Sequence, residues 1–63
     1  MKYTLKMLRI GENLTQADLA SALKVSRKTI SAWETGKSVP ATHMIDVICE
    51  FFGVSYDEIR WIP

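Results

Sequence analysis

The stretch covering residues 15–37, TQADLASALKVSRKTISAWETGK, constrains the fold of this chain more than any other. Its apolar residues recur at helical spacing in two short blocks, and Lys24-Val25 between the blocks leaves room only for a tight turn. Thr15 is expected to cap the first helix, with Asp18 in the capping-box position three residues later. Ser26 is expected to cap the second helix. We therefore predict two short helices joined by a tight turn.

The second of these helices has two chemically different faces. On a helical wheel, Ile30 and Trp33 point one way, toward a core. The opposite face carries two long cations and three small residues: Arg27, Lys28, Ser31, Ala32 and Thr35. Such a face can lie close to the floor of a DNA major groove, where Arg and Lys donate to guanine, Ser bonds to several bases and an Ala methyl contacts thymine. This layout is that of a helix-turn-helix over about residues 15–35.

Length and composition limit the remaining possibilities. Sixty-three residues allow one domain, spanning residues 1–63. The single Cys49 excludes an internal disulfide, and the single His43 leaves no recognisable zinc-ligand cluster. We expect no metal, no other cofactor and no small-molecule ligand. A lone cysteine, with no long apolar run and no signal-peptide pattern, favours a cytoplasmic protein without membrane contact.

The charge of the chain is unevenly distributed. The net charge is only +1, but four cations lie in or beside the second helix of the motif, opposed there only by Glu34: Lys24, Arg27, Lys28 and Lys37. Residues 38–59 contain no Lys or Arg and four acidic residues. A basic face on a nearly neutral protein suits phosphate contact. Ordinary solvated charge is the alternative interpretation of the asymmetry taken alone.

The rest of the sequence predicts three further helices. They cover about residues 4–11, about residues 42–52, and a short last segment that Ser55 and Glu58 should cap as a capping box. Ile59 should return to the core. With about five short helices and no convincing strand, the expected fold is a compact all-α domain.

Glu34 lies at the boundary between the two faces of its helix, where a charge near the core needs a partner. Arg9, beside the apolar face of the first helix, is the partner that we expect, in a structural ion pair. A catalytic role for Glu34 is disfavoured, because no second carboxylate, nucleophile or base has matching spacing. We therefore expect no catalytic residue and no enzyme activity.

The helix over residues 42–52 is apolar on two adjacent stripes. One stripe is expected to face the core: Ile45, Ile48, Cys49 and Phe52. The second stripe, together with the apolar tail, is a candidate dimer surface: Met44, Val47, Phe51, Trp61 and Ile62. The alternative is that the last segment of the chain folds over this stripe.

Three fragments, LTQADLA, VSRKTISAWETGK and FGVSYDEI, strongly resemble the phage repressor and Cro type of helix-turn-helix, also called the XRE type. Their order and spacing are specific, and the resemblance covers about residues 5–59. It implies a five-helix, lambda-repressor-like domain. Such a domain would bind a double-stranded DNA operator as a homodimer and regulate transcription, as a repressor.

The resemblance also assigns roles to residues. Gln16 matches a phosphate-clamping glutamine, and Arg9 with Glu34 matches the structural ion pair of the family. Base-reading positions are matched by Arg27, Lys28 and Ala32, with Ser31 as an additional contact. DNA backbone contacts are expected from Ser26, Thr35 and Lys37, and Lys24 is a further candidate.

Two residues depart from the family pattern. Lys24 stands where the family usually has Gly, and a positive φ there would cost about 1 kcal/mol relative to Gly. Arg27 stands where relatives often have Gln, so the operator sequences of those relatives do not predict the operator of this chain. Many relatives add a second domain, and without one the dimer would be built by this domain itself.

A second hypothesis from another functional class stays open. The domain would be a protein-interaction module of the same fold, such as an antitoxin or an inhibitor. In that case the apolar stripe of the helix over residues 42–52 and the tail would bind a different protein. Arg27 and Lys28 beside Gln16 favour the DNA-binding hypothesis, because a pure interaction module does not need them.

Overall fold

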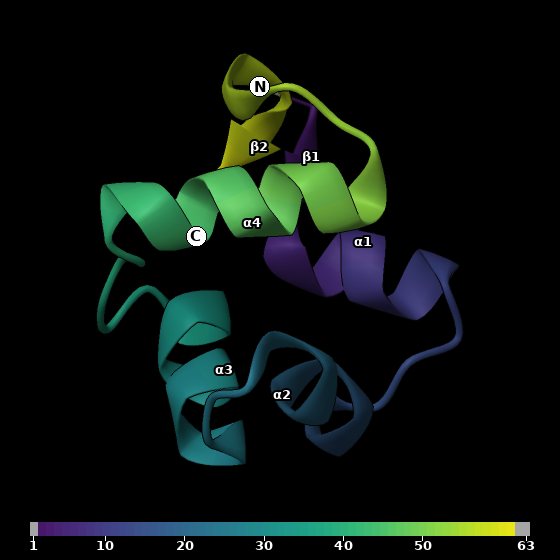
Figure 1. Cartoon of the computed structure of the whole chain (residues 1–63), viewed down its shortest axis with the longest axis vertical. Coiled ribbons are helices and arrows are strands. Elements are labelled where there is room, and N and C mark those ends of the chain that lie inside the picture. The colour runs from purple at the N-terminus through teal and green to yellow at the C-terminus, as the bar shows by residue number, and fades with distance from the viewer. Residues whose placement is uncertain (1, 62–63) are drawn as a thin grey trace.

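A computed structural model describes residues 2–61 of the chain. In chain order, its elements are β1 (Tyr3–Thr4), α1 (Leu5–Gly11), α2 (Gln16–Leu23), α3 (Arg27–Thr35), α4 (Thr42–Phe52), the 3-10 turn η1 (Tyr56–Glu58) and β2 (Ile59–Arg60). Helices α2 and α3 lie together at one end of the molecule, α4 crosses its middle, and β1 and β2 lie on the other side of α4 (Figure 1).

Side-chain caps set where the first three helices begin. The Thr4 hydroxyl accepts from the Met7 N–H at 3.1 Å at the start of α1. At α2, the Thr15 hydroxyl accepts from the Asp18 N–H at 3.0 Å, and the Asp18 carboxylate accepts from the Thr15 N–H at 2.9 Å. The Ser26 hydroxyl accepts from the N–H of residue 29 at 3.1 Å and caps α3. The predicted capping box of α2 and the predicted cap of α3 are confirmed.

The turn between α2 and α3 is built around Lys24, which adopts the left-handed conformation with φ 59° and ψ 42°. Its N–H donates to the Ser21 carbonyl at 3.3 Å, and the Val25 N–H donates to the Ala20 carbonyl at 2.9 Å. These bonds satisfy carbonyl groups that the end of a helix leaves open. Because Lys24 has a positive φ, the cost of about 1 kcal/mol expected for a lysine in place of glycine applies to this turn.

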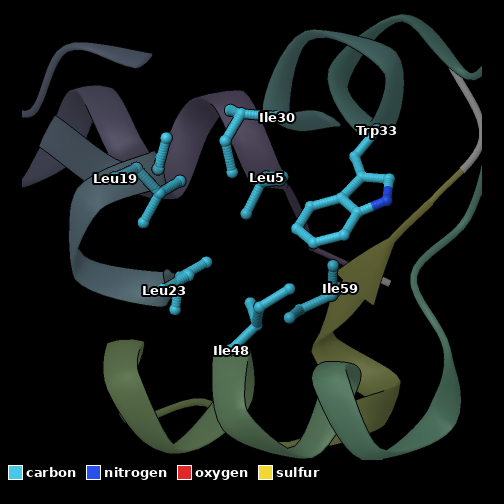
Figure 2. Packing of buried hydrophobic residues seen from close by; sticks show 8 residues of the cluster. Leu5, Leu19, Leu23, Ile30, Trp33, Ile48 and Ile59 are labelled. Atoms are coloured by element: carbon cyan, nitrogen blue, oxygen red, sulfur yellow. The ribbon is translucent and has the colours of Figure 1, made fainter. Parts of the chain in front are cut away.

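The core forms where the four α-helices and β2 meet. Its buried side chains come from every one of these elements and point toward a common centre (Figure 2): Leu5, Leu19, Leu23, Ile30, Trp33, Ile48 and Ile59. Leu19, Ile30 and Ile48 are fully buried. Burying one such side chain stabilises the fold by about 1.5–3 kcal/mol. The inward direction predicted for Ile30, Trp33 and Ile59 is confirmed.

The all-α prediction is correct for the four α-helices and wrong for the fifth. In place of a fifth α-helix the chain forms the three-residue 3-10 turn η1, held by the Glu58 carboxylate, which accepts from the Ser55 N–H at 2.8 Å and from its hydroxyl at 2.9 Å. The backbone then extends, and β2 pairs with β1 in a parallel two-stranded sheet. The extended path lets Ile59 enter the core while its backbone bonds to β1, which a helix at this point would prevent.

Helix α4 has the predicted bounds and a partly exposed apolar surface. Ile45 and Ile48 are buried, whereas Cys49 and Phe52 are half-buried against the core. Val47 and Phe51 are more exposed, at 47% and 46%. Within residues 2–61, none of the helices has both the length and the apolar character needed to span a bilayer.

Candidate nucleic-acid interface

Helix α3 presents a polar face at the surface because Ile30 and Trp33 hold its other side in the core. Arg27, Lys28 and Thr35 are exposed. Two further residues of the predicted reading face, Ser31 and Ala32, are half-buried and form its low central part. The Thr35 hydroxyl donates to the carbonyl of residue 31 at 2.9 Å, so this side chain lies along the helix. The face therefore carries long cations in the first turn of α3 and short side chains, which project little from the helix, in the next turn.

The cations around α3 are available to an external anion. Lys24 in the turn, Arg27 and Lys28 in the first turn of α3, and Lys37 after its end are all exposed. In the described part of the chain, the only ion pair within 4.0 Å joins Arg9 to Glu34. Since Arg9 balances Glu34, the acidic residue of α3 does not neutralise these four cations.

The predicted ion pair between Arg9 and Glu34 is confirmed. The Arg9 Nε donates to Glu34 Oε2 at 2.7 Å, and a second guanidinium nitrogen donates to Oε1 at 3.3 Å. The third nitrogen donates to the Leu14 carbonyl at 2.7 Å. The two side chains are 11% and 3% exposed. This pair joins α1 to α3 and also fixes the backbone just before α2.

Gln16, the predicted phosphate contact, lies in the first turn of α2 and is half-buried. Its Nε2 donates to Glu34 Oε1 at 3.1 Å, so Gln16 joins the ion pair in one network. An open hollow of about 460 Å³ lies at this point, lined by Arg9, Gln16, Arg27 and residues of the turn before α2. The structure thus brings two predicted contact residues, Gln16 and Arg27, to one concave site.

The bond between Gln16 and Glu34 is the feature of this site that sequence reasoning missed. The sequence predicts only a phosphate as the partner of Gln16 and only Arg9 as the partner of Glu34. The available signal was the number of acceptor sites on a carboxylate, which has two oxygens and about four lone-pair positions. Arg9 does not fill all of them, so a buried Glu34 has capacity for a further donor.

Asp18 stabilises the start of α2 at the edge of the hollow. The Thr15 backbone N–H, and then the Thr15 hydroxyl, hold the pKa of the Asp18 carboxyl below its usual range. The carboxylate is thus ionised at neutral pH and bound to Thr15, which lines the hollow. The backbone that carries Gln16 is therefore anchored on both sides, by Asp18 and by the bond from Arg9 to Leu14.

The residues predicted to form a dimer surface differ in exposure. Val47 and Phe51 are exposed on α4, whereas Met44 and Trp61 are half-buried against the core. Ile62 lies outside the described residues. The most accessible part of the candidate surface is therefore the pair Val47 and Phe51.

Comparison with known proteins agrees with this geometry. A family profile described as "Helix-turn-helix" matches residues 5–59. The chain is 49% identical over 55 residues to the HTH-type transcriptional activator BcrR of Enterococcus faecalis, covering 87% of this chain and 27% of BcrR. It is 49% identical over 59 residues to the uncharacterized HTH-type transcriptional regulator MJ0272 of Methanocaldococcus jannaschii, covering 94% of this chain and 89% of that protein.

A further relative is named as an antitoxin and not as a transcription regulator. The chain is 42% identical over 55 residues to the antitoxin PezA of Streptococcus pneumoniae, covering 87% of this chain and 35% of PezA. The chain thus spans about a third or less of BcrR and PezA and most of MJ0272. The profile match, the identities and the arrangement of α2 and α3 lead to one conclusion. The chain belongs to the XRE-type helix-turn-helix family of DNA-binding transcription regulators.

Proposed function

We propose that the chain binds an operator in double-stranded DNA as a homodimer and represses transcription from it. The observation that carries the proposal is the surface of α3, which combines exposed Arg27 and Lys28 with a low centre at Ala32. In the helix-turn-helix geometry, such a face enters the major groove and its N-terminal residues contact base edges. Occupation of an operator that overlaps a promoter represses by exclusion and needs no contact beyond the DNA.

In this proposal the residues around α3 divide into two groups. Arg27, Lys28, Ser31 and Ala32 contact bases, because they lie on the face that meets the groove floor. The second group contacts phosphates from the edges of the helix: Gln16, Lys24, Ser26, Thr35 and Lys37. Phosphate contacts set position and supply most of the affinity, whereas base contacts supply specificity.

The homodimer is proposed to form through α4. Val47 and Phe51 are apolar and exposed, and lie one helical turn apart on the same side of the helix. Two protomers related by a two-fold axis would contact half-sites about 34 Å apart on one side of the DNA. The half-buried Met44 and Trp61 remain proposed contributors to the dimer, as does Ile62, which lies outside the described residues.

The experiment that tests the proposal is selection of bound duplexes from a random DNA library. We expect a two-fold symmetric consensus, two protomers per selected duplex, and affinity at least about a thousandfold above random DNA. Titration at two salt concentrations separates the specific complex from phosphate attraction alone. No enrichment, with weak binding that depends only on salt, would contradict the proposal.

A second candidate function is binding of a different protein through the same α4 surface. It is favoured by the 42% identity to an antitoxin and by the exposure of Val47 and Phe51. The variant Phe51→Glu distinguishes the two functions. If α4 forms the homodimer, the variant sediments as a monomer and loses operator affinity. If α4 binds another protein, the wild-type chain is already monomeric alone and the variant keeps its DNA affinity.

A further inference from the structure

The geometry points to Glu34, held by Arg9, as a positioning residue that orients the Gln16 carboxamide so that its second N–H, the one not bound to Glu34, faces an incoming DNA phosphate. This inference rests on the proposed function, since it takes the phosphate as the ligand of Gln16. It assigns the ion pair a role in binding in addition to its role in joining α1 to α3.

The first step in the argument is the chemistry of the carboxylate. An ionised carboxylate only accepts hydrogen bonds, whereas a carboxamide has a donating nitrogen on one side and an accepting oxygen on the other. Glu34 Oε1 lies 3.1 Å from Gln16 Nε2, so it selects the amide orientation in which the nitrogen faces this corner of the site. The opposite orientation would place two acceptor oxygens together.

The second step concerns the remaining donor. The Gln16 nitrogen carries two N–H groups, and one of them is used by Glu34. The other N–H is on the same nitrogen, and Gln16 lines the open hollow of about 460 Å³. A phosphate oxygen only accepts, so it matches this N–H and not the amide oxygen. A freely rotating amide would present the oxygen to the phosphate part of the time.

The third step concerns charge. An unpaired Glu34 behind Gln16 would repel a phosphate, because it is buried to 3% exposure and poorly screened. Arg9 cancels that charge through two hydrogen bonds and itself lines the hollow. The pair is therefore neutral toward an anion, while Glu34 keeps the acceptor that orients Gln16.

The test uses a variant in which both ionic partners are replaced, Arg9→Met with Glu34→Met. Removing both charges together avoids an unpaired buried ion, and such pair replacements often retain stability. Denaturation of this double variant verifies that it is folded. Gln16→Ala is then made in the wild-type chain and in the double variant, and binding to a short mixed-sequence DNA duplex is measured at low salt.

In the wild-type background we expect Gln16→Ala to weaken binding about tenfold, as for one hydrogen bond to a charged group. In the Met-Met background the same substitution should weaken binding by less than about twofold, because the amide has already lost its orientation. Lys37→Ala is the matched control, and its effect should be equal in both backgrounds. An equal effect of Gln16→Ala in both backgrounds would overturn the inference.

A readout without DNA separates this inference from the proposed function. Gln16 is the only glutamine and Asn13 the only asparagine in the chain, so the two side-chain amides are easily assigned by NMR. In the free wild-type protein, the Gln16 amide should be rigid and the exposed Asn13 amide mobile. In the Met-Met variant, the Gln16 amide should become as mobile as that of Asn13.

Mobility of the Gln16 amide in the free wild-type protein equal to that of Asn13 would also overturn the inference. Absence of any DNA binding by the wild-type chain, with a rigid Gln16 amide, would instead overturn the proposed function and remove phosphate as the ligand. The two failures are therefore distinguishable.

Discussion

Tyr3 and Ile59 lie opposite each other in the parallel pair β1–β2, although they come from opposite ends of the chain. The Lys2 N–H extends the pairing by donating to the Glu58 carbonyl at 2.9 Å. Ile59 is 3% exposed and packs in the same cluster as Leu5. The short sheet therefore connects both ends of the chain to the core that supports α3.

Replacing Ile59 by Ala should lower the free energy of unfolding by about 2–5 kcal/mol, since the cavity opens in the core. That is a large part of the stability of so small a domain, which is about 5 kcal/mol. Chemical denaturation followed by circular dichroism measures it. The control is Tyr56→Ala, at a residue 63% exposed in the same segment, which should change stability by less than about 0.5 kcal/mol. Equal effects of the two substitutions would show that β2 does not hold the core together.

Lys24→Gly should stabilise the fold and weaken DNA binding. A left-handed residue other than glycine costs about 1–2 kcal/mol, whereas glycine loses about 0.4–1 kcal/mol more entropy on folding. The first effect is larger, so the melting temperature should rise by about 4 °C. DNA affinity should fall, because a proposed phosphate contact is removed. Thermal melting and DNA titration of one preparation measure both effects.

Asn13→Gly is the matched control for this substitution, because Asn13 also has a positive φ, 58°, but asparagine tolerates that conformation well. Its stabilisation should be smaller than that of Lys24→Gly. If both variants gained equally, the strain at Lys24 would be no greater than at an ordinary turn residue.

The helices of this chain could be predicted because their signals are local. Thr15 with Asp18, and Ser26 at the next cap, lie within three residues of the groups that they bond. The strands could not be predicted, since each has two residues and the pairing of Tyr3 with Ile59 depends on the finished core. Ser55 and Glu58 predict a helix where the 3-10 turn forms, because these capping residues are also those of a helix start.

The contacts of the candidate site could also be predicted only in part. The pairing of Arg9 with Glu34 follows from a charge placed at the edge of a buried face, and the structure confirms it. The bond from Gln16 to Glu34 does not follow from the sequence, because it depends on how α2 and α3 cross and not on the spacing of residues along either helix. Side-chain direction within the packed motif is therefore the information that the sequence lacks.

Acid should destabilise the fold in part through Asp18. Its pKa in the folded state lies below the ordinary value of 3.8, so its stabilising contribution is complete above 3.8 and is lost as pH falls through the lowered value. Asp18→Asn cannot titrate. Its melting temperature should therefore fall less than that of the wild-type chain between neutral pH and a pH well below 3.8.

Asp57 and Glu58 also have lowered pKa values, caused first by the Ser55 hydroxyl and by the Ser55 N–H, respectively, so part of the acid dependence should remain in Asp18→Asn. Asp46→Asn on the exposed side of α4 serves as the control and should keep the wild-type dependence. An acid dependence of Asp18→Asn equal to that of wild type would show that the capping box contributes nothing through its charge.

Cys49 should react slowly with thiol reagents in the folded protein. Burial raises the pKa of its thiol, and the negative charges of Asp46 and Glu58 raise it further, so less thiolate is present at a given pH than in an unfolded chain. Reaction with an aromatic disulfide reagent at mildly alkaline pH, with and without denaturant, measures the difference. An equal reaction rate in the folded and the denatured protein would contradict the prediction that the Cys49 thiol reacts slowly when folded.

Arg27 and Lys37 should affect DNA binding in different ways, because Arg27 lies on the exposed face of α3 that is proposed to meet the groove, whereas Lys37 follows the end of the helix. Arg27→Ala should weaken binding to the selected operator by about 1–3 kcal/mol and relax the preference at one base pair of each half-site. Lys37→Ala should weaken binding to all sequences alike and reduce the salt slope by about one. Titration of both variants against the operator, single-base-pair changes and random DNA at several salt concentrations distinguishes these patterns.

If both variants lost affinity uniformly across all sequences, the division of α3 into base-reading and phosphate-binding residues would be wrong. In that case α3 would hold DNA by charge alone, and specificity would have to come from the shape of the duplex.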